Sequence, residues 1–219
     1  MTKKELPVSV KRFLKTLKPQ LIAIVGGSGS GKTWLADKLQ KAFGENAMRL
    51  SLDDFYKDRS HLSLRRRSAI NFDHPRAIDW ANVERVLKRI AIGQNVEKPA
   101  YDFTNHARVR KRELVKPKAW IIMDGLWLLR RPAVRRFFSC RVFIKCPQRV
   151  CLRRRLDRDL TERGRGAAQV KKQFLQQVIP MHQRFVAPQL RWANIIMTKP
   201  QLDQVNKLAA KIKILSKSK

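Results

Sequence analysis

The sequence has no long apolar run, and this excludes a membrane-spanning helix. Its continuous apolar stretches are far shorter than the roughly 18 residues that cross a bilayer. The lysines near the amino terminus are not followed by an apolar stretch with a small-residue cleavage site, as in a secretory signal. We therefore expect a soluble, cytoplasmic protein with no membrane partner.

Cysteine is scarce as well. The three cysteines, Cys140, Cys146 and Cys151, are separated by five and four residues. This spacing matches no common zinc motif, and no nearby histidine completes one. We expect reduced, partly buried thiols in a cytosolic protein.

Acidic residues are few. Asp and Glu total 17 against 49 Lys and Arg, which gives a formal net charge of +32 at pH 7. The positive electrostatic field of such a charge attracts polyanions and phosphorylated ligands. No nucleic-acid-binding motif accompanies the charge. Non-specific contact with nucleic acid is therefore one interpretation, and a solvated basic surface is the other.

The order of apolar patterns predicts one α/β domain with a parallel sheet. The chain has 219 residues, of which 43% are hydrophobic, and this suffices for one well-buried core. Short apolar stretches predict strands at 21–25, 47–52, 120–123, 141–145 and 194–197. Helical spacing predicts helices at 31–43, 80–92, 147–160, 169–185 (bent near Pro180) and from Leu202 to Ile212. Between them, 53–79 is expected to be loop with short helical turns, and 94–118 a hairpin or long loop.

Residues 26–33, Gly-Gly-Ser-Gly-Ser-Gly-Lys-Thr, fit the phosphate-binding pattern G-x-x-x-x-G-K-[ST] between a predicted strand and a predicted helix. The glycines let successive N–H groups point at phosphate oxygens, and the helix N-terminus adds a partial positive charge. Lys32 is expected to reach the β- and γ-phosphates, and the Thr33 hydroxyl to bind magnesium. The expected ATP-binding residues of the loop are Gly26, Gly27, Ser28, Gly29, Ser30, Gly31, Lys32 and Thr33.

A second magnesium ligand is expected at Asp124, which follows the predicted strand 120–123 where an acidic ligand is typical. The guanine-reading N-K-x-D motif is absent from the sequence, which argues against a GTPase. Motor and AAA-type ATPases usually need a longer chain. A small-molecule kinase needs a base, an acceptor pocket and a cationic lid. Candidates for all three are present.

Six ordered segments carry a family resemblance. They are GGSGSGKT at 26–33, LSLDDFY at 50–56, NFDHPRAID at 71–79, PAYDFTNHAR at 99–108, IIMDG at 121–125 and RDLTERGRG at 158–166. Through them the chain resembles the uridine–cytidine kinases, within the wider uridine kinase and phosphoribulokinase group, over residues 21–197. The phosphate loop is generic, whereas the NFDHP and YDFxxHxR segments are specific.

The resemblance implies a three-layer α/β P-loop NTPase fold with a central, mostly parallel sheet, helices on both faces and an arginine-rich lid at about 153–168. The kinase domain would span 20–199. A helical extension is expected at 1–19, where apolar residues have helical spacing, and a C-terminal helix with a basic tail at 200–219.

The resemblance also implies the roles of individual residues. Asp53 would be the general base and lie near the metal, although the adjacent Asp54 stands where the family often has serine, so the choice between them stays open. Asp73 would accept the ribose hydroxyls. The other implied substrate contacts are Tyr56 and Phe72 around the sugar and base, Tyr101 and His106 at the pyrimidine edge, and Gln173.

The lid is implied to carry four functional arginines. Arg158 and Arg163 would contact the ATP phosphates during catalysis, and Arg155 and Arg165 the substrate. Arg155 and Arg158 are three residues apart on the predicted helix, away from a stripe formed by its leucines. The leucines of the stripe are Leu152, Leu156 and Leu160.

The sequence departs from the family at several positions. Asp124 is one methylene shorter than the usual glutamate, so we expect it to bind magnesium through water. Leu52 replaces a usually polar residue, and Arg76 stands where an acidic residue is common. Arg66, Arg67 and the 105–118 segment are expected to add positive charge around the acceptor.

The leading hypothesis is an ATP- and magnesium-dependent kinase that transfers the γ-phosphate to the 5′-hydroxyl of uridine or cytidine. One alternative is a kinase of the same architecture that acts on a phosphorylated sugar, glycerate or pantothenate, because the extra basic residues suit an anionic acceptor. The other is a basic P-loop protein that binds RNA. The family resemblance also favours a homo-oligomer.

Overall fold

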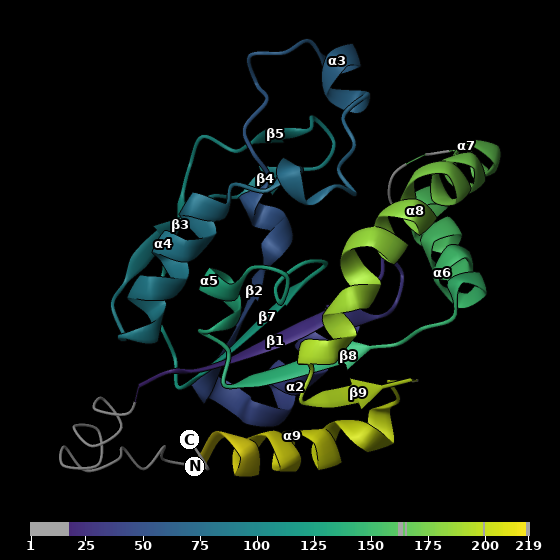
Figure 1. Cartoon of the computed structure of the whole chain (residues 1–219). Coiled ribbons are helices and arrows are strands. Elements are labelled where there is room, and N and C mark those ends of the chain that lie inside the picture. Colours follow the sequence, from purple (N-terminus) through teal and green to yellow (C-terminus); the bar gives the residue numbers. More distant parts are fainter. Residues whose placement is uncertain (1–17, 162–163, 165, 199, 218–219) are drawn as a thin grey trace, which may run out of the picture.

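A five-stranded parallel sheet forms the centre of the computed structural model, which describes residues 18–161, 164, 166–198 and 200–217 (Figure 1). The strands are β1 (Gln20–Gly26), β2 (Ala47–Ser51), β7 (Trp120–Gly125), β8 (Cys140–Ile144) and β9 (Ile195–Met197). Their order in the sheet is β2-β7-β1-β8-β9, and every pairing is parallel. The predicted parallel sheet is therefore confirmed.

The central strand β1 explains why these strands appear in the sequence as continuous apolar runs. Leu21, Ala23 and Val25 pack into the core on one face of the sheet, whereas Ile22 and Ile24 pack into the core on the other. All five residues are almost fully buried. A parallel sheet covered on both faces needs apolar side chains at every position, not at alternate ones.

Helices cover both faces of the sheet. On one face lie α2 (Lys32–Phe43) and α9 (Leu202–Lys217), which contribute Leu35, Leu39 and Ile212 to the core. On the other face lie α4 (Trp80–Ala91), α5 (Pro132–Arg135) and the helical segment around Phe185. The predicted three-layer α/β fold is confirmed, whereas the short helix α5 was not predicted.

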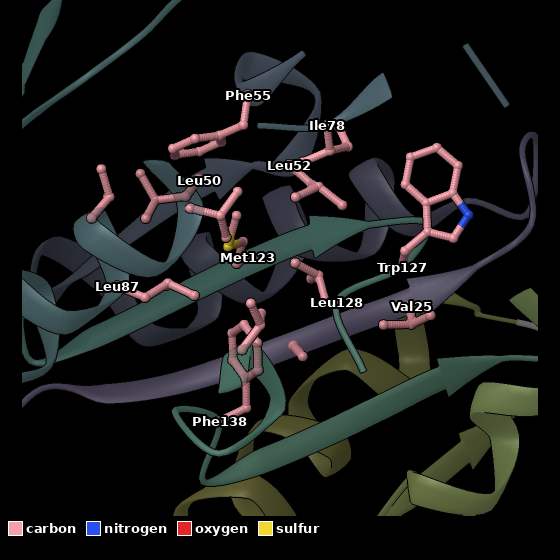
Figure 2. Packing of buried hydrophobic residues seen from close by; sticks show 14 of the residues in the cluster. Val25, Leu50, Leu52, Phe55, Ile78, Leu87, Met123, Trp127, Leu128 and Phe138 are labelled. Atoms are coloured by element: carbon pink, nitrogen blue, oxygen red, sulfur yellow. The ribbon is translucent and has the colours of Figure 1, made fainter. Parts of the chain in front are cut away.

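The core between the sheet and α4 includes Leu52, one of the positions where the sequence departs from the family pattern. Figure 2 shows Leu50, Leu52, Phe55 and Ile78 packed together over β7. The Leu52 side chain lies so close to Gly125 that no β-carbon fits there. An apolar residue at position 52 is therefore explained by its burial.

The two loop regions contain short elements, as predicted. In and beside 53–79 these are η2 (Leu52–Phe55), α3 (Leu64–Ser68) and η3 (Pro75–Ala77), whereas η1 (Gly44–Asn46), between α2 and β2, was not predicted. Residues 94–118 form two small antiparallel pairs, β3 (Val96–Lys98) with β6 (Glu113–Val115) and β4 (Tyr101–Asp102) with β5 (Ala107–Arg108).

The helical region after β8 departs most from the prediction. It consists of α6 (Gln148–Thr161), α7 (Ala167–Gln173), a π-helix η4 (Phe174–Val178), α8 (Ile179–Met181), a second π-helix η5 (His182–Val186) and a 3-10 helix η6 (Ala187–Trp192). The predicted bend near Pro180 takes the form of changes in helix type. Proline has no N–H for the regular α-helical hydrogen bond, which favours such a change.

The buried face of α6 is not the leucine stripe. Its buried residues are Cys151, Arg155 and Asp159, whereas Leu160 is 46% exposed. The arginine that was expected to lie away from the packed face therefore lies on it. Inside the protein, Arg155 Nε lies 3.5 Å from Asp159 Oδ2 in an ion pair, and Arg155 donates hydrogen bonds to Ser28 and Gln173.

Three smaller expectations can also be compared with the structure. Cys140, Cys146 and Cys151 are all free, and burial raises the pKa of the Cys151 thiol to about 12. Among the described residues, no helix is long and apolar enough to cross a membrane. The helix predicted over 1–19 lies almost wholly outside the described residues.

Candidate active site

The phosphate loop joins β1 to α2 at the point where the strand order reverses, which is where ligands bind in open α/β sheets. Gly29 and Gly31 have φ angles of +77° and +95°, a left-handed conformation that favours glycine. Gly31 precedes α2 without any side-chain cap. A β-carbon on Gly29 would collide with the backbone of Cys151, so α6 lies directly against the loop.

Lys32 lies inside the curve of this loop. Its Nζ donates a hydrogen bond to the carbonyl of Gly27 at 2.8 Å. Burial lowers the pKa of Lys32, while the carboxylates of Asp124 and Asp53 oppose that shift. The structure thus brings Lys32 and both predicted acidic residues into one electrostatic neighbourhood.

Asp124 and Thr33 form a compact oxygen pair. Thr33 Oγ1 donates to Asp124 Oδ2 at 2.9 Å, and Asp124 is only 4% exposed. No group of three histidine, cysteine or acidic side chains suited to a metal occurs in the described parts of the chain. Magnesium in nucleotide sites takes one or two protein oxygens, with phosphates and water completing its shell. Thr33 and Asp124 fit that requirement.

Arg49, which the sequence did not single out, lies beside the pair formed by Thr33 and Asp124. Its Nη1 lies 3.1 Å from Asp124 Oδ1, and its Nε lies 2.9 Å from Asp37 Oδ1. Arg49 therefore holds one oxygen of Asp124 while Thr33 holds the other. Nothing in the local sequence links β2 to Asp124, because the contact depends on the pairing of β2 with β7.

The structure separates Asp53 from Asp54. Ser51, which caps η2, accepts a hydrogen bond from the Asp53 N–H at 3.2 Å, and its backbone lies opposite Asp124 in the sheet. Asp54 instead accepts from Lys98 Nζ at 2.9 Å, and burial raises the pKa of its carboxyl. Asp53 acts electrostatically on Lys32, whereas Asp54 belongs to the ion pair with Lys98 of the β3 strand.

The aromatic residues predicted for the acceptor lie together. Tyr56 packs against Phe72 and Tyr101 at ring-centre distances of 5.3 and 5.2 Å. The Tyr56 hydroxyl donates to the Phe72 carbonyl at 3.1 Å, which fixes the NFDHP segment over this cluster. His106 stacks on Phe72 at 4.9 Å with an angle of 15° between the rings.

The turn that presents His106 is built by its neighbours. His106 is in a left-handed conformation, with φ of 48°, which is uncommon for a residue with a side chain. Asp102 accepts from the N–H groups of Thr104 and Asn105 at 2.8 and 3.2 Å, and Arg67 donates to the Asn105 carbonyl at 2.8 Å. Arg67 therefore holds the turn, which is a structural role beyond the added charge that we predicted for it.

Tyr101 has a hydroxyl that its surroundings do not satisfy. The oxygen is buried and has no hydrogen-bond partner among the described residues. Burial also raises the pKa of Tyr101 to about 12, so the hydroxyl is protonated. A buried donor of this kind costs free energy unless a ligand or water accepts from it.

Arg155 connects the parts of the site. Its Nη1 donates to Ser28 Oγ at 3.0 Å and lies 3.8 Å from Asp73 Oδ1. Its Nη2 donates to Gln173 Oε1 at 2.9 Å. The side chain is 6% exposed, so this link between the phosphate loop, the NFDHP segment and α7 is inside the protein.

Asp159 anchors the arginines of α6 and was not predicted. It is fully buried, accepts from Arg158 Nε and Nη2 at 2.9 and 2.7 Å, and lies 3.5 Å from Arg155 Nε. Arg158 in turn contributes its charge to the neighbourhood of Lys32. The sequence contains a signal for this pair, since Asp159, in the RDLTERGRG segment, comes four residues after Arg155, a spacing that brings side chains together on one face of a helix. Arg163 and Arg165 lie outside the described residues.

His182 was also missed. It comes from the second π-helix, and its ring lies against Gly27 of the phosphate loop. Figure 1 shows α8, the helix immediately before it, beside α6 and α7 near the carboxyl ends of β1 and β8. No local pattern singles out His182, because it faces the loop only after the chain has folded.

Comparison with known proteins agrees with this geometry. The sequence profile described as Phosphoribulokinase / Uridine kinase family matches residues 21–206. The chain belongs to this family. It is similar to the uridine kinase of Alkaliphilus metalliredigens (strain QYMF), with 37% identity over 201 residues that cover 90% of this chain and 97% of that one. It is also similar to the uridine kinase of Clostridium novyi (strain NT), with 35% identity over 93% of this chain and 100% of that one.

Within the solved structures, the family's fold recurs. The phosphoribulokinase from Rhodobacter spheroides matches with a TM-score of 0.61 at 16% identity, over 83% of this chain and 70% of that one. At this identity the likeness concerns the fold alone. Membership of the family makes the chain a small-molecule kinase that acts on a hydroxyl acceptor, with ATP as phosphate donor and magnesium as cofactor.

Proposed function

We propose that this protein phosphorylates the 5′-hydroxyl of a pyrimidine ribonucleoside, uridine or cytidine, at the expense of ATP. The observation that carries the proposal is the buried Arg155, which joins Ser28 of the phosphate loop to Asp73 and Gln173. Donor and acceptor segments are thus held by one side chain, in a chain 37% identical to a uridine kinase over 90% of its length.

On the donor side, magnesium and ATP when bound supply the γ-phosphoryl group and a metal that neutralises its charge. Lys32 and the loop amides hold the phosphates, and Thr33 and Asp124 supply the protein oxygens for the metal. Arg158 adds positive charge beside Lys32. These groups are held in place before the reaction by Gly27, Arg49 and Asp159, so little reorganisation is needed.

On the acceptor side, Asp53 takes the proton that the 5′-hydroxyl loses as its oxygen attacks phosphorus. Asp73 accepts hydrogen bonds from the ribose hydroxyls. Phe72 packs on the sugar and base, while Tyr101 and His106 meet the polar edge of the pyrimidine. The Tyr101 hydroxyl has no partner among the described residues, and the neighbouring rings of Tyr56 and Phe72 suit a planar ligand that accepts a hydrogen bond, such as a pyrimidine base.

A panel of acceptors tests this proposal. ADP release is measured with uridine, cytidine, glycerate, pantothenate and a sugar phosphate. We expect turnover with a pyrimidine ribonucleoside, and its loss in Lys32→Ala and in Asp53→Asn with the fold intact. Lys41→Ala, at the exposed end of the same helix, should behave as wild type. Turnover with glycerate, pantothenate or the sugar phosphate alone would overturn the assignment of the acceptor.

An arginine-rich surface favours a second activity, the binding of nucleic acid. Arg135 and Arg191 both lie 4.2 Å from the ring centre of Trp192, and burial together with the charges of Arg141 and Arg191 lowers the pKa of Arg135. Among the described residues, none of these three arginines has a carboxylate partner. Uncompensated charge of this kind suits a phosphate backbone.

Single-stranded RNA binding at several salt concentrations tests this second activity. We expect Arg135→Gln with Arg191→Gln to reduce the salt dependence of the affinity by about two phosphate contacts. Arg85→Gln, on α4, where Arg85 bonds Asn82 and the Glu97 carbonyl, is the matched control. An unchanged slope in the double variant would refute a role for this surface.

A further inference from the structure

The ring of His182 packs against Gly27 of the phosphate loop. A β-carbon on Gly27 would lie 2.9 Å from Nδ1 and 3.2 Å from Cε1 of the His182 ring. Both distances are too short for ordinary contact, so any residue larger than glycine at position 27 would push the ring away. The loop and the second π-helix therefore fit together through this one pair.

The same ring faces the acceptor side. A small cavity is lined by the polar residues Ser28, Asp73 and His182 and closed by apolar residues that include Met181 and Val186. Ser28 belongs to the phosphate loop and Asp73 to the NFDHP segment. His182 thus lies where the donor and acceptor segments meet, and it is held there because its neighbours Phe185 and Val186 are anchored in the core.

The backbone at this point is itself unusual. His182 is the first residue of the π-helix His182–Val186, which follows one turn of α-helix that contains Pro180. A π-helical turn inserts an extra residue and so rotates the side chains that follow, and such turns are frequent at functional sites. His182 also follows the first π-helix, Phe174–Val178, which therefore changes the direction in which its side chain projects.

The chemical state of the ring suits contact with a substrate. Nδ1 is buried and has no hydrogen-bond partner among the described residues. Burial and the positive charge of Lys32 lower the pKa of His182, so the imidazole is neutral near pH 7. A neutral imidazole has one donor and one acceptor nitrogen, and a buried nitrogen without a partner is costly in the absence of a ligand.

We propose that His182 is a substrate-contacting residue of the kinase site, which hydrogen-bonds the hydroxyl end of the acceptor and orients it toward the phosphate loop. This inference rests on the proposed function, because it concerns the same acceptor. It assigns the ring to the acceptor and not to ATP, since Asp73 of the NFDHP segment lines the same cavity, while Lys32 is held by the Gly27 carbonyl. Asp53 keeps the role of base.

The test compares His182→Ala and His182→Asn with His61→Ala, which changes an exposed histidine. We expect His182→Ala to lower kcat/KM for the acceptor about tenfold or more, with a lower kcat, a higher acceptor KM and an unchanged Kd for a fluorescent ATP analogue. His182→Asn can place a hydrogen-bonding amide near the position of Nδ1, so it should restore part of the loss. His61→Ala should match wild type.

Two results would overturn the inference. One is a kcat/KM in both His182 variants within twofold of wild type. The other is a loss confined to the affinity for the ATP analogue, which would assign the ring to the nucleotide. If His182→Ala does not fold, the same comparison is made with His182→Asn, whose melting temperature is checked first. Failure of this inference can be distinguished from failure of the proposed function. If the proposed function is wrong, the wild-type protein does not turn over uridine or cytidine, and the His182 variants are then compared on the acceptor that the panel identifies.

Discussion

The Tyr101 hydroxyl gives a prediction with effects of opposite sign on stability and on binding. In the ligand-free protein this hydroxyl is buried without a partner among the described residues, so it has lost its hydration and gained nothing in return. The Tyr101→Phe change removes only the oxygen. The ring keeps its contacts with Tyr56 and Phe103, at 5.2 and 5.3 Å. We expect the free energy of unfolding to stay the same or rise by about 1 kcal/mol.

The same change should weaken the acceptor. A hydrogen bond from a neutral hydroxyl to the base contributes about 1 to 1.4 kcal/mol, which corresponds to a rise of roughly five- to tenfold in the KM for uridine. Denaturant unfolding measures the first effect and steady-state kinetics the second.

Tyr56→Phe is the matched control for this pair of measurements, because the Tyr56 hydroxyl donates to the Phe72 carbonyl at 3.1 Å. Its removal should lower the free energy of unfolding by about 1 kcal/mol. If Tyr101→Phe proved less stable than wild type, or left the uridine KM unchanged, the role given to this hydroxyl would be incorrect.

Two further predictions concern buried and titrating side chains. Asp159→Asn should lower the free energy of unfolding by about 3 kcal/mol, because Arg155, whose side chain is 6% exposed, would lose a buried partner. In thermal unfolding the control variant Asp157→Asn, which changes an exposed residue, should melt near the wild-type temperature, and equal melting temperatures of the two variants would refute the buried network. His74 accepts from the Arg76 N–H through Nδ1, and burial and nearby arginines lower its pKa, so the unfolded chain binds more protons and stability should fall as the pH drops below about 6.5. His74→Asn keeps an acceptor for this cap and should flatten that dependence in unfolding curves between pH 5 and 7; an unchanged slope would count against His74.

The sequence predicted what depends on short stretches of chain. The phosphate loop, the strand before it and the acidic residue at the end of β7 are encoded in runs of five to eight residues, and all lie where they were expected, as does the start of the helix that follows the loop. The clustering of Tyr56, Phe72, Tyr101 and His106 was expected from the family resemblance and is seen in the structure.

What the sequence did not predict depends on contacts between distant segments. The face of α6 that becomes buried carries Arg155 and Asp159, and hydrophobic periodicity assigns charged residues to the surface. The link from Arg49 to Asp124 requires two strands to pair, and the approach of His182 to Gly27 requires two distant segments of the chain to meet. None of these has a local signal, since each charge or ring finds its partner only in the folded chain.

The most direct test of the central claim is the identity of the phosphorylated product. Wild-type protein is incubated with ATP, magnesium and uridine, and the product is analysed by phosphorus NMR together with mass spectrometry. The account predicts uridine 5′-monophosphate and ADP in equal amounts, with no product from Lys32→Ala. ADP and free phosphate without a phosphorylated nucleoside, or a phosphate on a ribose hydroxyl other than the 5′, would contradict it.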